Sequence, residues 1–212
     1  MKNVLTKKML VFGAIFFMSC APKFFKPQWV NEKSPDTFTA RFETSRGIFD
    51  VEVKREWSPL AADRMYQLVK HHYFEHVLFY RVVPGFVAQF GGSDSVKNLA
   101  WQKTIIPDEK VLYSNKKGTL SFARSGKETR GTDLYINLND NLFLDTLEYS
   151  GVKGFPAFGT VTKGMDVVES LYSGYSEKTM DKLDTMYLDR SRFLEIFPAL
   201  DEINKAYIVN QK

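Results

Sequence analysis

The stretch FYRVVPGFVAQFGG, Phe79 to Gly92, carries one arginine between two aromatic-rich apolar runs and closes on a pair of glycines. A charged guanidinium in so apolar a segment needs a partner or a task, because burying an unpaired charge is costly. The two runs, 79–83 and 86–90, flank a Pro-Gly turn and predict paired β-strands. Arg81 is therefore the first candidate for a functional residue.

Strand-like patterns continue on both sides of this stretch. Apolar and polar residues alternate in 37–44 and 48–55 around a Ser-Arg-Gly turn, which predicts a hairpin. Further short β-like runs, separated by turn residues, are expected at 118–124, 134–138 and 157–161.

Two segments have the pattern of amphipathic helices. The first, 58–71, starts with Ser58 as N-cap candidate and Pro59 at the first helical position. The second is 164–173. Many short strands with two long helices predict a mainly β fold, which we expect to be a closed antiparallel β-barrel capped by two α-helices, with a C-terminal helical extension.

The N-terminus has the features of an export signal. Three lysines precede a ten-residue apolar run, which is too short for a membrane-spanning helix of about 20 residues. The run ends at Phe-Met-Ser-Cys, which resembles the lipidation motif of bacterial lipoproteins, with Cys20 as the lipidated residue. We expect a signal peptide at 1–19, an anchor at Cys20, a proline-containing tether at 20–36 and a location in the bacterial cell envelope.

Charge and cysteine content bear on nucleic-acid binding and on disulfide formation. Removal of residues 1–19 takes away three lysines and no acid, so the formal charge falls from +4 to +1 and gives no support for nucleic-acid binding. Cys20 is the only cysteine, so an intramolecular disulfide is excluded. We expect a monomer with one main domain at 37–173 and a C-terminal extension, 174–212, packed on that domain. The sequence of the extension predicts a helix around Phe193 and a strand at 206–209.

Three blocks of the sequence carry a family resemblance. FYRVVPGFVAQFGG, GTLSFARSGKETRGTDLYINLNDNLFLD and FPAFGTVTKGMDVVESL are similar, in order and spacing, to the signature blocks of the cyclophilin-type peptidyl-prolyl isomerases. The match runs from about Thr39 to Leu171. It implies that the chain rotates prolyl peptide bonds in proline-containing segments of exported proteins and needs no cofactor and no metal.

The resemblance also implies roles for individual residues. Arg81 is the catalytic arginine, and Gln89 binds the substrate backbone and positions it. Ala123 and Arg124 contact the residue that precedes the proline. The pocket for the proline ring is expected to be lined by Phe86, Val87, Leu134 and Phe158.

Several residues depart from the usual family pattern. Asp133 stands for a glutamine, Arg124 for an asparagine and Leu134 for a phenylalanine. Phe143 stands for a frequent tryptophan, and Phe155 for a histidine or tyrosine. All five belong to the expected substrate-binding groove. Because Asp133 and Arg124 both replace neutral residues on one rim, we expect them to form an ion pair.

Two other functions are compatible with parts of the sequence. His72 to His76, HYFEH, fits an inverted zinc-protease motif, but the helical pattern ends near His71, so the two imidazoles are not expected to share a face. A catalytically weak module that only binds proline-containing segments is the second alternative. The altered rim favours it, whereas intact Arg81, Phe86 and Gln89 favour the enzyme.

Overall fold

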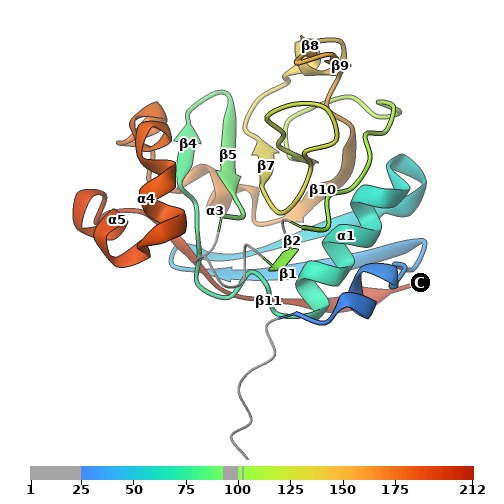
Figure 1. The fold of residues 1–212 in the computed structure, drawn as a ribbon, viewed down its shortest axis with the longest axis horizontal. Coiled ribbons are helices and arrows are strands. Elements are labelled where there is room, and N and C mark those ends of the chain that lie inside the picture. Colours follow the sequence, from blue (N-terminus) through green and yellow to red (C-terminus); the bar gives the residue numbers. More distant parts are fainter. Residues whose placement is uncertain (1–24, 93–99, 102) are drawn as a thin grey trace, which may run out of the picture.

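The computed structural model describes residues 25–92, 100, 101 and 103–212, and most of its strands belong to one curled sheet (Figure 1). Its strands are β1 (Thr37–Thr44), β2 (Gly47–Lys54), β3 (Val77–Leu78), β4 (Arg81–Val83), β5 (Val87–Phe90), β6 (Thr119–Phe122), β7 (Leu134–Asn137), β10 (Ala157–Lys163) and β11 (Glu202–Gln211). The order across the sheet is β3-β11-β1-β2-β10-β6-β7-β5-β4, and every pair is antiparallel. A separate hairpin contains β8 (Glu148–Tyr149) and β9 (Val152–Lys153).

The helices are few and mostly short. They are α1 (Pro59–Lys70), α3 (Met165–Glu169), α4 (Leu183–Leu188) and α5 (Arg190–Ile196), with the 3-10 turns η1 (Pro27–Asn31), η2 (Arg55–Trp57), η3 (Leu142–Asp145) and η4 (Ser176–Lys182). The mainly β fold is confirmed. The hairpin of β1 and β2 and the helix α1 lie within one residue of their predicted bounds, whereas α3 is half the predicted length.

The expected closure of the barrel is wrong, because no strand pairing within the described residues joins the two edges of the sheet. Those edges are β3 and β4, and only Phe79 and Tyr80 separate them. The two strands therefore follow one another along a single path and do not lie side by side. The sheet curls into a half-barrel whose open side is reached by the C-terminal helices.

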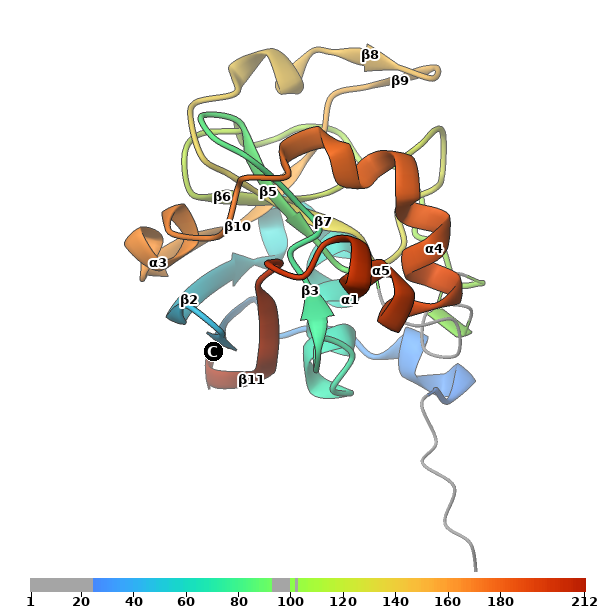
Figure 2. The ribbon, with the colours of Figure 1, turned by 90° about the vertical axis from the view of Figure 1, so that its left-hand side faces the viewer.

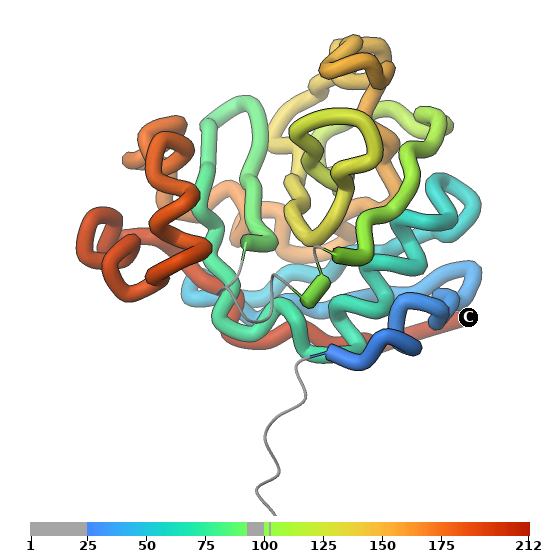
Figure 3. Tube along the Cα trace, viewed as in Figure 1, coloured from blue at the N-terminus to red at the C-terminus, as the bar shows by residue number. Residues whose placement is uncertain are grey.

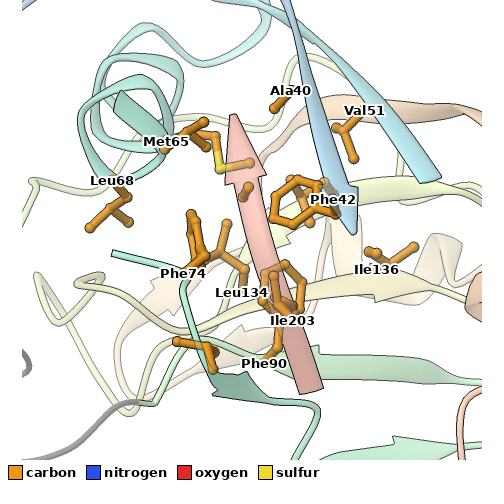
Figure 4. Close-up of a cluster of buried hydrophobic side chains, with 14 of the residues drawn as sticks. Ala40, Phe42, Val51, Met65, Leu68, Phe74, Phe90, Leu134, Ile136 and Ile203 are labelled. Carbon is orange, nitrogen blue, oxygen red and sulfur yellow. The ribbon is translucent and has the colours of Figure 1, made fainter. Parts of the chain in front are cut away.

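The main core fills the inside of this curl. Met65 and Leu68 of α1 pack against phenylalanines of the sheet, including Phe42 and Phe90 (Figure 4). The centroid of the Phe42 ring lies 4.8 Å from that of Phe49, 5.6 Å from that of Phe74 and 6.0 Å from that of Phe90. A core this rich in aromatic rings holds the strands in a fixed register and so fixes the side chains on the outer face.

The last strand is longer than predicted and belongs to the interior of the sheet. Expected at 206–209, it covers Glu202–Gln211 and pairs with β1 on one side and β3 on the other. Ile203 and Ala206 are buried under α1 and its neighbours. The chain leaves the half-barrel after β10 and α3, forms a helical excursion through η4, α4 and α5, and returns as β11 (Figure 3).

The helical excursion has a small core of its own. We call residues 174–200 the C-terminal insertion. Leu78 and Tyr80, at the edge of the half-barrel, form a buried cluster with insertion residues Met186, Phe193 and Phe197. Figure 2 shows the insertion in front of the strands, and η4 contacts β4 directly. The insertion is therefore fixed against the edge strand that carries Arg81.

Residues 25–36, the described part of the expected tether, pack on the domain and do not extend away from it. Trp29 stacks on His71 with ring centroids 3.8 Å apart, and Phe25 contacts Trp101 at 5.0 Å. The backbone N–H of Ser34 donates to the carboxylate of Asp63 at 2.9 Å. The expected signal peptide and Cys20 lie outside the described residues. Within those residues, no helix combines the length and apolar character needed to cross a bilayer.

Candidate active site

Arg81 lies on the outer face of the sheet, directly opposite Gln89. The register of β4 on β5 pairs Arg81 with Gln89, Val82 with Ala88 and Val83 with Val87. Because side chains alternate along a strand, Val82 and Ala88 enter the core while their neighbours face out. Nη1 of Arg81 donates to Oε1 of Gln89 at 3.0 Å.

The Pro-Gly turn brings an aromatic ring under the guanidinium. Gly85 has a φ of 72°, which suits glycine in the third position of a turn that begins at Val83. The N–H of Phe86 donates to the carbonyl of Val83 at 3.0 Å and closes the turn. The ring of Phe86 then lies 5.4 Å from the Arg81 guanidinium carbon, a cation–π contact.

An apolar cavity of about 470 Å³ opens beside Arg81. Its floor is a cluster separate from the main core, in which Val87, Tyr135, Leu144 and Phe155 are buried. Phe143 lies at the rim, 56% exposed, with its ring 6.0 Å from that of Phe86. Other lining residues are Gln89, Ala123, Arg124, Leu147, Tyr149, Glu177 and Met180. A cavity of this size and character suits a short peptide segment.

Two residues expected in the proline pocket are not there. Leu134 and Phe158 are fully buried in the main core, Leu134 among the residues of Figure 4 and Phe158 stacked on Phe122 at 5.2 Å. Strand alternation gives the reason: Leu134 faces inward, so the next residue, Tyr135, faces the cavity. Tyr135 lies directly opposite Gln89 in the pairing of β5 with β7.

The expected ion pair between Asp133 and Arg124 is also wrong. The Arg124 guanidinium donates instead to the carbonyls of Gly154 at 2.6 Å and Val152 at 3.0 Å. It also lies over the Phe155 ring at 4.0 Å, and burial lowers its pKa. Arg124 therefore holds the loop that carries Phe155. The positive charge of its guanidinium is stabilised by the dipoles of the two main-chain carbonyls.

Asp133 belongs to a cluster of hydroxyl groups on the other side of the groove. It accepts hydrogen bonds from Tyr80 at 2.8 Å and, at the longer distance of 3.4 Å, from Tyr187. Burial raises the pKa of Asp133 to about 6, and the two hydrogen bonds oppose that rise. The side-chain amide of Gln89 donates to the Tyr80 hydroxyl at 2.7 Å. Hydrogen bonds thus connect Arg81 to the partly buried carboxyl group of Asp133 through Gln89 and Tyr80.

A second cavity, of about 360 Å³, adjoins the first. The two share Gln89, Ala123, Arg124, Tyr149 and Met180. Asp133 lines the second cavity and not the first. A peptide that fills the apolar cavity can therefore continue past Ala123 and Met180 into a second space, lined by both polar and apolar side chains.

The C-terminal insertion supplies a carboxylate to the site. Oε2 of Glu177 accepts from Nε of Arg81 at 2.8 Å, and Oε1 accepts from Nη2 at 2.7 Å. This two-point pair with Arg81 lowers the pKa of Glu177, so the carboxylate is ionised at neutral pH. The sequence offered no signal for this contact, because Glu177 lies 96 residues after Arg81 and outside the three family blocks.

The HYFEH segment does not form a helical metal site. Helix α1 ends at Lys70, and His72 and His76 both have left-handed backbone angles. The His72 imidazole contacts Glu75 and the His76 imidazole contacts Glu202. Within the part of the chain that the structure describes, no three metal-ligating side chains cluster.

Comparison with known proteins agrees with this geometry. Residues 39–190 match the family described as cyclophilin type peptidyl-prolyl cis-trans isomerase/CLD. The chain belongs to this family. A peptidyl-prolyl cis-trans isomerase of Acinetobacter baylyi is 31% identical over 131 residues, which cover 61% of this chain and 69% of the relative. Peptidyl-prolyl cis-trans isomerase A of Dickeya dadantii is 31% identical over 130 residues, covering 60% and 67%.

A solved structure shows the same fold. The cyclophilin type isomerase of Cryptosporidium parvum superposes with a TM-score of 0.60 at 18% identity, covering 83% of this chain and 99% of its own. That protein was also crystallised in the presence of the dipeptide Ala-Pro. With the family established, the chain is a peptidyl-prolyl cis-trans isomerase.

Proposed function

We propose that the groove beside Arg81 is the active site and that Arg81 is its catalytic residue. The observation that carries this proposal is a guanidinium held at the edge of an apolar cavity, bonded to Gln89 and resting on Phe86. A prolyl ring fits such a cavity, and its amide nitrogen then faces the charged edge.

The chemistry needs no covalent bond to break. Partial double-bond character holds the planar amide with a barrier of roughly 18–20 kcal/mol. In the twisted amide the nitrogen regains a lone pair that accepts a hydrogen bond. A donor aimed at that nitrogen therefore stabilises the twisted state more than the planar state, which is what lowers a barrier. Lowering it by about 7 kcal/mol accelerates rotation about 10⁵-fold.

Arg81 retains donors for this task. A guanidinium has five N–H donors. Glu177 takes one from Nε and one from Nη2, and Gln89 takes one from Nη1. Within the described part of the chain, one N–H on each Nη is left without a partner. These two groups are the ones that we assign to the substrate.

The clients that we propose are proline-containing segments of exported proteins, met at the bacterial cell envelope. The motif around Cys20 and the preceding apolar run support this location. The protein would act there as a monomer anchored through a lipid.

The assignment of Arg81 is tested by measuring kcat/KM for isomerisation of proline-containing peptides. Arg81→Ala should lower kcat/KM about 100- to 1000-fold, the usual effect of removing one transition-state donor. Arg81→Lys should retain only part of the wild-type kcat/KM, because lysine lacks the planar, forked guanidinium of arginine. Arg192→Ala, at an exposed site in α5, is the control and should match wild type.

Two outcomes would contradict this assignment. If Arg81→Ala, with an unchanged circular dichroism spectrum, kept wild-type activity, the catalytic group would lie elsewhere. If wild type bound the peptides without accelerating their isomerisation, the binding module would be the better description. The ion pair with Glu177, which occupies two donors of Arg81, is the feature that favours that alternative.

A further inference from the structure

The pair between Glu177 and Arg81 is built into the fold. The turn η4 that carries Glu177 is held by buried Thr179 and by Tyr175, whose ring lies 5.0 Å from that of Phe197. Met180 follows Glu177 by three residues, which is one turn of a 3-10 helix, so the two side chains project on the same side. Both line the apolar cavity.

Arg81 keeps its orientation by other means. Gln89 and Phe86 hold the guanidinium from β5 and from the preceding turn, and neither belongs to the insertion. The Arg81 side chain is 17% exposed, whereas that of Glu177 is 58% exposed. The Glu177 carboxylate therefore faces solvent and an approaching peptide, and its charge is its main contribution.

The other charged groups of the groove are already occupied. Arg124 is bound to two main-chain carbonyls and covered by Phe155. Asp133 lies behind the hydroxyl groups of Tyr80 and Tyr187. Near the Arg81 end of the apolar cavity, Glu177 is thus the carboxylate that a substrate side chain meets first.

The route of the peptide leads past this carboxylate. By family resemblance, Ala123 and Arg124 contact the residue that precedes the proline. Both also line the passage between the cavities, together with Met180. A side chain at that position therefore passes Met180, one turn away from Glu177.

We propose that Glu177 is a specificity-determining residue of the isomerase, which favours substrates with a lysine or arginine immediately before the proline and disfavours an acid there. A cationic side chain completes a charge pair with the free side of the carboxylate, whereas an acidic one meets a like charge. This inference rests on isomerase activity in the groove beside Arg81, and it assigns a function to the C-terminal insertion.

The test compares peptides that differ only in the residue before proline, which is lysine, alanine or glutamate. For wild type, kcat/KM for the lysine peptide should exceed that for the glutamate peptide about tenfold at low salt. This ratio should shrink at high salt, since a partly exposed charge is screened. Glu177→Gln should bring it to within about twofold of one, and Glu177→Lys should reverse it.

Asp181→Asn provides the matched control, because it removes a carboxylate from the same 3-10 turn at an exposed position that lines neither cavity. It should retain the wild-type ratio. The affinities of the same three peptides, measured by calorimetry, give a second reading that does not need turnover. An inactive wild type would therefore overturn the assignment of Arg81 and still leave this inference tested by binding.

A Glu177→Gln variant that kept the wild-type ratio in both measurements would overturn the proposal. So would an equal loss of the ratio in Asp181→Asn, since that would trace the preference to the general charge of the insertion and not to the contact with Arg81.

Discussion

Arg81 has fixed partners on three sides, and each comes from a different part of the chain. Gln89 belongs to the next strand, Phe86 to the turn between the two strands, and Glu177 to the C-terminal insertion. A donor restrained in this way loses little freedom when substrate binds. The same chain of hydrogen bonds continues through Tyr80 to Asp133, so a partly buried carboxyl group lies at the back of the site.

Asp133 should make stability depend on pH in an unusual direction. Its folded pKa of about 6 lies above the ordinary value of 3.8, so the folded state binds the proton more tightly than the unfolded state. This contribution is present in full below about pH 4 and is lost as the pH rises through 6, by up to about 3 kcal/mol. Asp133→Asn should remove the effect.

The measurement is the free energy of urea unfolding at several values between pH 4 and pH 7. Wild type should lose stability relative to Asp133→Asn over this interval, while Asp181→Asn should follow wild type. Parallel curves for wild type and Asp133→Asn would show that Asp133 titrates normally.

The sequence predicted part of this site, and the errors have physical causes. Arg81, Gln89 and Phe86 were assigned through the family resemblance of one continuous stretch, whose strand and turn signals agree with the structure. Leu134 was assigned in place of Tyr135 because a shift of one residue moves a side chain to the opposite face of a sheet. Glu177 was missed because its contact with Arg81 depends on tertiary packing and leaves no local pattern.

At the scale of elements, periodicity predicted those that have one polar and one apolar face. Strand β1 alternates strictly between buried and half-buried residues, and α1 has a Ser-Pro start, so the hairpin and the helix were both placed well. The strand β11 was predicted too short, since its pattern of buried residues is irregular; β1 pairs along most of one edge, whereas β3 pairs only with Glu202 and Ile203 on the other. The insertion is held in position by contacts between aromatic residues, and the sequence pattern does not show which of these residues meet in the fold.

The aromatic core of the insertion should be needed for its position beside β4. Phe193 is fully buried with Tyr80 and Met186, so Phe193→Ala should lower the free energy of unfolding by about 3–5 kcal/mol. Leu188→Ala is the matched control in the neighbouring helix, since Leu188 is 80% exposed and should change stability by less than about 0.5 kcal/mol. Urea unfolding of both variants checks this. Equal effects would mean that the insertion has no core of its own.

At the scale of the whole molecule, the packing of the N-terminal segment limits how far the domain could lie from the lipid anchor that we propose at Cys20. Packing of Phe25 and Trp29 begins five residues after Cys20. Five residues span at most about 18 Å even when fully extended. Anchorage at Cys20, as proposed, would thus hold the domain close to the bilayer surface.

The anchor is tested by metabolic labelling with a fatty-acid probe. Wild type should take up the label and fractionate with membranes, whereas Cys20→Ser should do neither. Label on Cys20→Ser, or wild type found wholly in the soluble fraction, would show that Cys20 is not the anchor.

The open edge of the half-barrel has a consequence for association. Among the strands that the structure describes, β4 pairs only with β5, so its other edge has no strand partner there and is the kind of surface on which a second chain adds a strand. In this protein η4 lies against that edge and covers it with a helical turn. The turn that brings Glu177 to Arg81 therefore also protects the molecule against intermolecular strand addition and aggregation.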